Sequence, residues 1–157
     1  MNADRRYQAI MAAPFGKLGI ACSETALLRL DFLPPQMATQ TADSPLAQTV
    51  VGQLADWLID PDWIFSLPLA ACGTAHQNRV WQAISAIPRG QVLTYGELAR
   101  QIGSAARAVG QACGANPWPL IVPCHRVVAC NGQGGFMQQT DAAALSVKHW
   151  LQQHERY

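Results

Sequence analysis

The 157-residue sequence has few charged side chains and no long hydrophobic run. Charged residues make up only 13% of the chain and hydrophobic residues 50%. This is the composition of a folded globular protein, and it excludes a disordered charged tail. No apolar stretch reaches the roughly 18 residues of a membrane-spanning helix. Near the N-terminus, Gln8, Pro14 and Lys17 interrupt the apolar segment that a signal peptide needs, so we expect neither secretion nor a membrane partner.

The sequence also lacks the cysteine patterns of disulfide-rich and zinc-binding proteins. Its five cysteines are odd in number and scattered, and none forms a Cys-x-x-Cys pair. We therefore predict reduced thiols and a cytoplasmic location. Cys22, Cys72 and His76 do not have the spacing of metal ligands, so the sequence predicts no metal and no other cofactor.

A strong excess of either charge is also missing, because the formal net charge is only +1. The charges are unevenly distributed, however. Residues 1–72 carry four Lys or Arg against seven Asp or Glu, a net charge of −3, whereas residues 73–157 carry seven against three, a net charge of +4. The asymmetry weakly favours the second half as the part that contacts a polyanion.

The first half of the chain has the pattern of a small α+β domain. Short apolar segments separated by turn residues predict strands at residues 6–14, 17–23 and 26–33. A polar, proline-bounded loop follows, and residues 46–60 then have apolar side chains at helical spacing: Leu46, Val50, Leu54, Trp57 and Leu58. Residues 63–71 are a candidate fourth strand.

The second half is mainly helical. Residues 75–88 place Val80, Trp81, Ile84 and Ile87 on one helical face. In residues 93–103, Thr94 is a candidate N-cap with Glu97 as its capping-box partner. A tight turn and a second short helix at residues 104–117 complete a helix-turn-helix pattern, and a last helix is predicted at residues 141–155.

The second helix of this pair consists largely of alanine and glycine. Such a helix either packs closely against another helix or lets a large, flat partner such as a DNA backbone approach. Both interpretations are open on the pattern alone, since each glycine costs a helix roughly 1 kcal/mol relative to alanine. In the second interpretation, Arg107 is the long side chain that enters a groove or a base stack.

The sequence "PLIVPCHRVVAC" places a thiol, an imidazole and a guanidinium at consecutive positions in an apolar segment. A single cysteine is most often an inert, small hydrophobic residue. Here Pro123 fixes the backbone before Cys124, so that the cysteine lies at a turn, where backbone N–H groups favour a thiolate. Because adjacent side chains diverge, a proton relay from Cys124 to His125 needs a bridging water. The imidazole also needs an acidic partner, and the candidates are Asp141 and Glu155.

Four segments resemble the O6-alkylguanine-DNA alkyltransferases, also called methylated-DNA–protein-cysteine methyltransferases. "IVPCHRVV" (121–128) resembles the active-site motif of this family, and "PRGQVLTYGELA" (88–99) its first DNA-binding helix region. "ARAVGQACGANP" (106–117) resembles the recognition helix and Asn-Pro hinge, and "KHWLQQHE" (148–155) the final helix. About seventy-five residues match in order.

The resemblance implies an α+β fold with two domains. Residues 1–72 would form a small ribonuclease-H-like α/β domain. Residues 73–157 would form a mainly helical, winged-helix-like domain with a helix-turn-helix, which binds DNA and accepts the alkyl group.

The resemblance further implies direct DNA repair by a single-turnover methyltransferase. Its partner would be double-stranded DNA containing O6-alkylguanine, with O4-alkylthymine as an open second substrate. The protein would be a monomer in solution, and cooperative binding on DNA is left open.

By the same resemblance, the catalytic residues are Cys124, His125, Glu155, Tyr95 and Asn116. Cys124 would accept the alkyl group, His125 and Glu155 would form the relay, and Asn116 would hold the hinge. Tyr95 would crowd the 3′ phosphate and supply a proton to guanine O6. Arg126 would be structural, pairing with acidic or carbonyl groups.

The resemblance also assigns residues to DNA binding and to the pocket. Arg107 would replace the extruded base in the stack, and the other DNA contacts would be Thr94, Tyr95, Gly96, Ala108 and Gly110. The backbone carbonyls of Cys124 and Val127 would accept from the guanine amino group. Val127 and the aromatic or sulfur side chains of Phe136 and Met137 would line the pocket.

Two alternatives remain. A lesion-binding protein on the same scaffold would need no acceptor cysteine. A cysteine hydrolase would need a directly hydrogen-bonded base and an oxyanion site, and would leave the helix-turn-helix unexplained.

Overall fold

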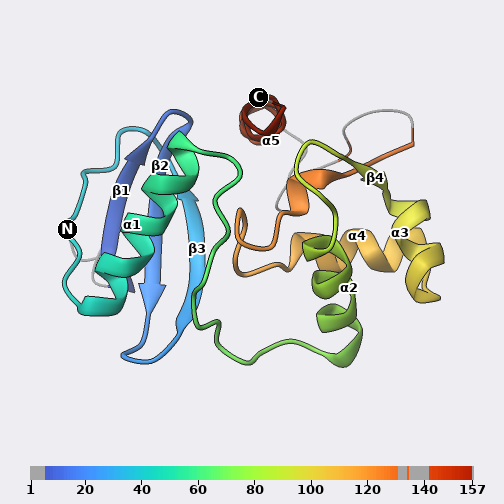
Figure 1. The fold of residues 1–157 in the computed structure, drawn as a ribbon, viewed down its shortest axis with the longest axis horizontal. Helices are drawn as coiled ribbons and strands as arrows, with labels where there is room; N and C mark the ends of the chain where they lie inside the picture. The colour runs from blue at the N-terminus through green and yellow to red at the C-terminus, as the bar shows by residue number, and fades with distance from the viewer. Residues whose placement is uncertain (1–5, 131–133, 135–141, 157) are drawn as a thin grey trace. The chain divides into compact units, whose positions relative to one another are not determined.

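The computed structural model describes residues 6–130, 134 and 142–156 of the chain (Figure 1). The chain divides into two compact units, Met1–Ala71 and Cys72–Tyr157. Each unit combines its own elements into a core, and together they make an α+β protein.

The N-terminal unit is a three-stranded antiparallel sheet covered by one helix. Strands β1 (Ala9–Ala13), β2 (Gly16–Cys22) and β3 (Leu27–Leu33) pair in the order β1-β2-β3. Helix α1 (Pro45–Ile59) packs on β1 and β2 (Figure 1). It begins at Ser44, whose side chain accepts a hydrogen bond from the backbone N–H of Ala47. Its buried side chains are Ala47, Val50, Leu54 and Trp57.

The three strands and the helix confirm the sequence prediction for this unit. The candidate fourth strand is wrong. In residues 63–71, Leu69 makes only an isolated bridge with Leu27. The carbonyl of Pro68 accepts from the backbone N–H of Leu27, but a proline has no N–H to extend the ladder. Leu46 and Leu58 are half-buried rather than core residues.

The C-terminal unit is built mainly from helices. They are α2 (Ala75–Ser85), α3 (Tyr95–Ile102), α4 (Ala106–Gly114) and α5 (Ala142–Glu155). Two short strands, β4 (Leu93–Thr94) and β5 (Val127–Val128), pair in parallel. A single 3-10 turn, η2 (Cys124–Arg126), precedes β5. The predicted helices are therefore confirmed, as is the capping box in which Thr94 and Glu97 exchange hydrogen bonds.

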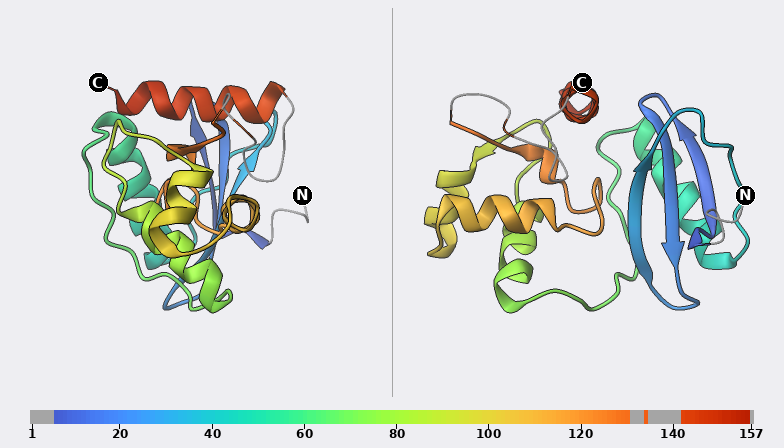
Figure 2. Two further views of the ribbon diagram at one scale, coloured as in Figure 1. Left: turned by 90° about the vertical axis from the view of Figure 1, so that its right-hand side faces the viewer. Right: turned by 180° about the vertical axis from the view of Figure 1, so that it is seen from behind.

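Helices α2, α3 and α4 pack against one another (Figure 2). Gly103 adopts a left-handed conformation with φ of 68° and ends α3, which lets the chain turn into α4. Helix α2 holds this turn from the side. His76 Nε2 lies 2.7 Å from Ser104 Oγ, and Arg79 Nη2 donates to the carbonyl of Ile102 at 2.5 Å.

The carboxyl end of α4 is held by a pair of tryptophans. Trp81 Nε1 donates to the carbonyl of Ala112 at 2.9 Å. The indoles of Trp81 and Trp118 pack edge to face, with ring centroids 5.6 Å apart and planes at 78°. Both indoles are buried. The close packing of α2 on α4 is thus one reason for the small side chains of α4.

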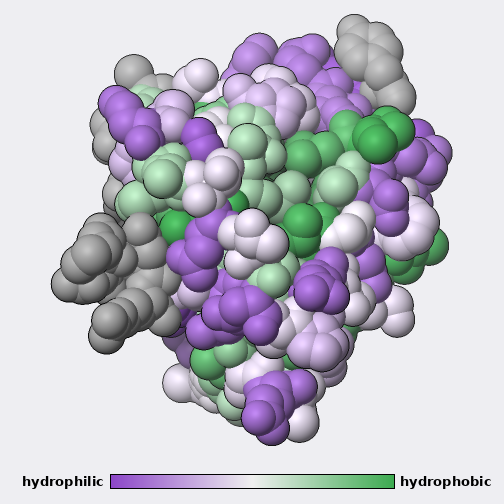
Figure 3. Space-filling view, turned by 90° about the vertical axis from the view of Figure 1, so that its left-hand side faces the viewer, coloured by the Kyte–Doolittle hydropathy of each residue, from purple (hydrophilic) through white to green (hydrophobic). Residues whose placement is uncertain are grey.

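No helix in the described part of the chain is long and apolar enough to cross a membrane. Figure 3 shows one face of the molecule, on which hydrophobic surface alternates with hydrophilic side chains. Among the described residues, the most exposed large hydrophobic side chains are Ile59, at the end of α1, and Ile64, in the segment that follows it.

Candidate active site

The sequence Cys124-His125-Arg126 forms the η2 turn, and its first two side chains are buried. Cys124 is 4% exposed and His125 is fully buried. The turn is closed by a hydrogen bond from the N–H of Arg126 to the carbonyl of Pro123, and the N–H of Val127 donates to the carbonyl of Cys124. A proline at the entrance and these two bonds therefore keep the thiol at a defined position inside the unit.

Asn116 connects the end of α4 to this turn. Its Nδ2 donates to the carbonyl of Val122 at 2.8 Å, and its Oδ1 accepts from the N–H of Trp118 at 2.9 Å. A further hydrogen bond links its side chain to Cys124. Leu120 lies in the segment between Trp118 and Val122 and is buried. Its φ of 77° is a left-handed conformation, which costs a non-glycine residue about 1 kcal/mol or more. The hinge position predicted for Asn116 is consistent with these contacts.

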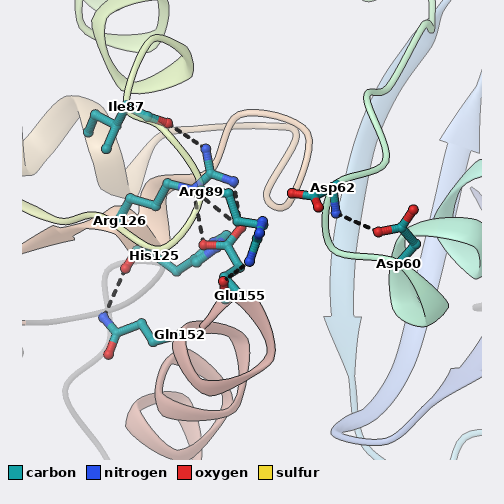
Figure 4. Close-up of polar contacts among 8 residues, drawn as sticks. All are labelled: Asp60, Asp62, Ile87, Arg89, His125, Arg126, Gln152 and Glu155. Atoms are coloured by element: carbon teal, nitrogen blue, oxygen red, sulfur yellow. Dashed lines mark hydrogen bonds and ion pairs between the residues drawn. The ribbon is translucent and has the colours of Figure 1, made fainter. Parts of the chain in front are cut away.

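Glu155, at the end of α5, pairs with both His125 and Arg126 (Figure 4). Its Oε1 lies 2.9 Å from His125 Nε2, and its Oε2 lies 2.5 Å from Arg126 Nη2. Arg126 Nη1 also donates to the carbonyl of Ile87 at 2.6 Å. Of the two predicted acidic partners of His125, the structure brings Glu155 to the imidazole, whereas Asp141 lies outside the described residues. The structural role predicted for Arg126 is confirmed.

These contacts determine the protonation states of the pair. Burial lowers the pKa of His125, although the carboxylate of Glu155 opposes this shift. Burial would raise the pKa of Glu155, but the hydrogen bonds from His125 and Arg126 lower it to about 2. Near neutral pH, the site therefore holds a neutral imidazole beside a carboxylate. Since the carboxylate can only accept, Nε2 carries the proton of the ring and Nδ1 is the basic nitrogen.

Burial also shifts the pKa of the Cys124 thiol. It raises the pKa of the Cys124 thiol, while the hydrogen bond from Asn116, the positive charge of Lys148 and the backbone N–H of Cys124 lower it less. Burial therefore favours the thiol at rest, because the desolvation of a buried anion outweighs the groups that stabilise the thiolate.

Lys148 is a residue of this site that the sequence reasoning missed. It lies on α5, one turn before Gln152 and two turns before Glu155, on the same face. Its side chain is fully buried. Burial lowers its pKa to about 8, although the charges of Cys124 and Cys113 raise it. Helical spacing from Glu155, read along α5 together with the buried Leu151, would have indicated this position.

Tyr95 completes the group around the sulfur. Lys148 Nζ lies 5.9 Å from the centroid of its ring. Burial and the charges of Cys113 and Cys124 raise the pKa of Tyr95 to about 12. Cys113, from α4, is also buried, and burial together with Cys124 raises its pKa to about 12. The structure therefore gathers Tyr95, Cys113, Cys124 and Lys148 from four different elements.

The residues predicted to bind DNA lie at the start of α3 and along α4. Thr94 caps α3 through its side-chain oxygen, and Gly96 follows in the first turn. Arg107 is exposed on the first turn of α4, and Ala108 is half-buried. A side chain at Gly110 would begin 4.0 Å from the ring of Tyr95. Of the predicted pocket residues, Val127 is buried in β5, and Phe136 and Met137 lie outside the described residues.

Comparison with known proteins connects this geometry to a family. The model of the DNA-binding domain of 6-O-methylguanine DNA methyltransferase matches residues 75–157, which is more than half of the chain. The chain belongs to this methyltransferase family. The family resemblance found in the sequence is thereby confirmed.

Relatives of this methyltransferase family match along nearly the whole chain. The methylated-DNA–protein-cysteine methyltransferase of Salmonella typhimurium is 39% identical over 171 residues, covering 98% of this chain and 97% of the relative. The protein of the same name from Methanosarcina acetivorans is 35% identical and covers 92% and 95%.

The fold is similar to that of the Mycobacterium tuberculosis O6-methylguanine methyltransferase. The TM-score is 0.78 at 34% sequence identity, with 94% of this chain and 90% of that chain covered. The structure of the M. tuberculosis protein in complex with DNA matches with a TM-score of 0.77 at 35% identity, over 94% and 91%.

Proposed function

We propose that this chain repairs O6-alkylguanine in double-stranded DNA by transferring the alkyl group to its own Cys124. The observation that supports this most directly is the buried group formed by Cys124, His125 and Glu155 in a chain of the methyltransferase family. Each molecule acts once, since no described group is placed to remove an alkyl group from the sulfur.

The neutral His125 is the base for the Cys124 proton. Its Nε2–H donates to Glu155, so Nδ1 is the atom that accepts, through a water that bridges it to the sulfur. The carboxylate of Glu155 holds the ring in this tautomer and stabilises the imidazolium that forms. The ammonium group of Lys148 stabilises the thiolate, because its positive charge lowers the pKa of Cys124.

The transfer itself leaves no new charge in the buried site. The sulfur forms a bond to the alkyl carbon, the bond from that carbon to guanine O6 breaks, and guanine leaves with the electron pair. Tyr95, whose pKa is about 12 and which is therefore protonated near neutral pH, donates a proton to the departing guanine. The proton taken from Cys124 then restores the tyrosine, so that overall an alkyl group and a proton exchange places.

Guanine O6 is stacked and paired inside a duplex, so the nucleotide must leave the helix to reach a buried thiol. Extrusion costs a few kcal/mol, and less for a damaged pair. We assign Arg107, exposed on α4, to the gap that the base leaves, and the small residues of α4 to the minor-groove side of the DNA. Thr94, Tyr95 and Gly96 contact the phosphates at the start of α3.

We further propose that residues 73–157 form the DNA-binding and alkyl-acceptor domain and residues 1–72 a ribonuclease-H-like domain. The two compact units support this division. The protein acts as a monomer. Its five free thiols, two of them exposed, support a reducing compartment such as the cytoplasm.

The test is the intact mass of the protein after incubation with duplex DNA that carries one O6-methylguanine. We expect each molecule to gain one methyl group on the peptide that contains Cys124, with the reaction complete at one equivalent. Cys124→Ser should bind the damaged DNA without gaining mass. Cys113→Ser, which removes the other buried thiol next to the site, should still be methylated.

The competing activities give different results. Tight binding of the lesion with an unchanged mass would identify a lesion-binding protein. Many turnovers on an ester would identify a hydrolase. A methyl group on Cys113 with Cys124 unmodified would contradict the assignment of the acceptor.

A further inference from the structure

Helix α5 runs alongside the η2 turn and presents three polar groups to it in order. Glu155 pairs with Arg126 and His125, and Gln152 Nε2 donates to the carbonyl of His125 at 2.9 Å. Lys148 lies one turn further back, about 6 Å along the helix axis from Gln152. This order places the amine of Lys148 at the end of the turn where Cys124 lies.

Two further observations put this amine beside the acceptor sulfur. Its Nζ lies 5.9 Å from the ring centroid of Tyr95, and Cys124, when ionised, interacts electrostatically with both Tyr95 and Lys148. The side chain is also fully buried, so its amine is enclosed with the sulfur rather than free in solvent. The site therefore contains a buried amine as well as the thiol.

The buried amine can act as a nucleophile once Cys124 is alkylated. Burial lowers the pKa of Lys148 to about 8, so part of the amine is neutral near neutral pH. The thiol before transfer and the thioether after it are both uncharged, and neither holds the proton on the amine.

We propose that Lys148 captures the second carbon of a 2-haloethyl group after Cys124 has accepted the first, closing an ethylene bridge between the two side chains. The inference rests on the proposed function, because Cys124 must first take the group from guanine. It adds a second activity: both reactive carbons of a bifunctional alkyl group would become bonded to one protein molecule.

The chemistry balances without another reagent. The sulfur of the 2-haloethyl thioether displaces the halide from the far carbon and forms a three-membered cyclic sulfonium. The neutral amine of Lys148 attacks a ring carbon, the bond from that carbon to sulfur breaks, and the electron pair returns to sulfur. The resulting ammonium loses one proton to solvent. The products are a thioether–amine bridge, a halide ion and a proton.

Capture by the buried amine competes with the other reactions of the cyclic sulfonium. A cyclic sulfonium that is not captured inside the protein reacts with water or with the bound DNA. The amine is enclosed in the same buried site as the sulfur, so it competes with both at a high effective concentration.

The experiment uses the full-length protein and a duplex with one freshly prepared O6-(2-chloroethyl)guanine. The intact mass is measured, followed by tryptic peptide mapping. The chain suits this test because Lys17 and Lys148 are its only lysines. We expect loss of chloride, a peptide containing Cys124 joined to one containing Lys148, and no tryptic cleavage after Lys148.

The bridged fraction should depend on pH. With a pKa of about 8, the neutral fraction of Lys148 rises about fivefold between pH 7 and pH 8. The titratable groups that face it are Cys124, Cys113, Tyr95 and His125. Of these, His125 has a pKa below neutral and the tyrosine and Cys113 have values of about 12, so none of these three changes charge in this interval.

The controls are matched lysine variants. Lys17→Gln, in the N-terminal unit, should form the bridge as the wild type does. Lys148→Gln should give a chloroethyl or hydroxyethyl thioether on Cys124, or a protein–DNA cross-link, instead of the bridge. If Lys148→Gln does not fold, the wild-type peptide map alone decides.

The outcomes separate this inference from the proposed function. An alkylated Cys124 with both lysines unmodified in the wild type overturns the bridge and leaves the repair activity intact. An unmodified Cys124 overturns the repair activity, and the bridge with it.

Discussion

Each of the two units contains a carboxylate that contacts both an arginine and a hydrogen-bonding ring, a tyrosine in one unit and a histidine in the other. The carboxylate is part-exposed in the first cluster and buried in the second. In the N-terminal unit, Asp31 Oδ2 accepts from Tyr7 Oη at 2.6 Å and from Arg29 Nε at 3.0 Å. In this ion pair, the side chain of Arg29 is 39% exposed and that of Asp31 is 33% exposed. In the C-terminal unit, Glu155 pairs with His125 and Arg126 and is 2% exposed.

The clusters also differ in what they connect. Arg29 and Asp31 are two residues apart on one strand, so their ion pair costs little chain entropy, and Tyr7 joins this cluster through a hydrogen bond that spans 24 residues. Arg126 and Glu155 are 29 residues apart and hold α5 against the η2 turn. Water screens the first pair, whereas the second must satisfy its charges internally. Burial, rather than the choice of residues, thus separates an ion pair that water screens from one in which the carboxyl pKa is lowered to about 2.

The largest effect should come from breaking the buried cluster. Glu155→Gln leaves the charge of Arg126 poorly compensated and removes the acceptor that orients His125. We expect a loss of about 3–5 kcal/mol in the free energy of unfolding, measured by urea denaturation. The alkyl-transfer rate should fall by about 100-fold or more, since general-base catalysis contributes that much. A rate within a factor of two of the wild type would show that Glu155 has no part in the relay.

The next largest effect should be a loss of stability of the buried cluster at acidic pH. The pKa of Glu155 is about 2 in the folded protein, so its contribution to stability is present above its ordinary value of 4.5 and is lost as pH falls toward 2. The difference between 4.5 and about 2 corresponds to roughly 3 kcal/mol. His125 adds a loss that begins below pH 6.5, because its folded pKa is lowered and only the unfolded chain takes up the proton. Urea denaturation at a series of pH values checks this, and Glu155→Gln should lack the lower part of the loss.

Removing the buried amine should stabilise the protein. The pKa of Lys148 is lowered from 10.5 to about 8, so keeping it charged at pH 7 costs roughly 3 kcal/mol. Lys148→Met should raise the free energy of unfolding by about 1–3 kcal/mol at pH 7 and slow alkyl transfer. Wild-type stability should rise between pH 8 and 10.5, as the folded protein loses the proton first, and the variant should lack this rise. Lys17→Met is the matched control and should change neither property. A less stable Lys148→Met protein would contradict the cost assigned to this charge.

The smallest effect should come from the exposed cluster. Asp31→Asn should reduce the free energy of unfolding by about 0.2–1 kcal/mol, as for other exposed ion pairs, and leave the alkyl-transfer rate unchanged. The difference from wild type should shrink further in high salt. A loss as large as that of Glu155→Gln would remove the distinction between the two clusters.

Much of this arrangement was predictable from the sequence because it depends on local patterns. The Thr94–Glu97 capping box follows from spacing alone, and the pairing of Glu155 with His125 was one of two predicted possibilities. Other features depend on distant parts of the chain. The protonation of Cys124 results from burial that several elements create together, and the burial of Lys148 contradicts the usual exposure of lysine. Residues 63–71 do not form a fourth strand because Pro68 has no backbone N–H. Whether a missing N–H interrupts a ladder depends on the position of the proline in the strand register.

The edge-to-face tryptophans give this protein a built-in optical reporter. The indole of Trp81 donates to the carbonyl of Ala112 in the last turn of α4, and the backbone N–H of Trp118 donates to Asn116, which also contacts the acceptor sulfur. A group added to that sulfur has to displace its neighbours, and Asn116 connects them to Trp118, whose ring packs on that of Trp81. Emission from these shielded rings should therefore follow the consumption of the protein in real time, without any label.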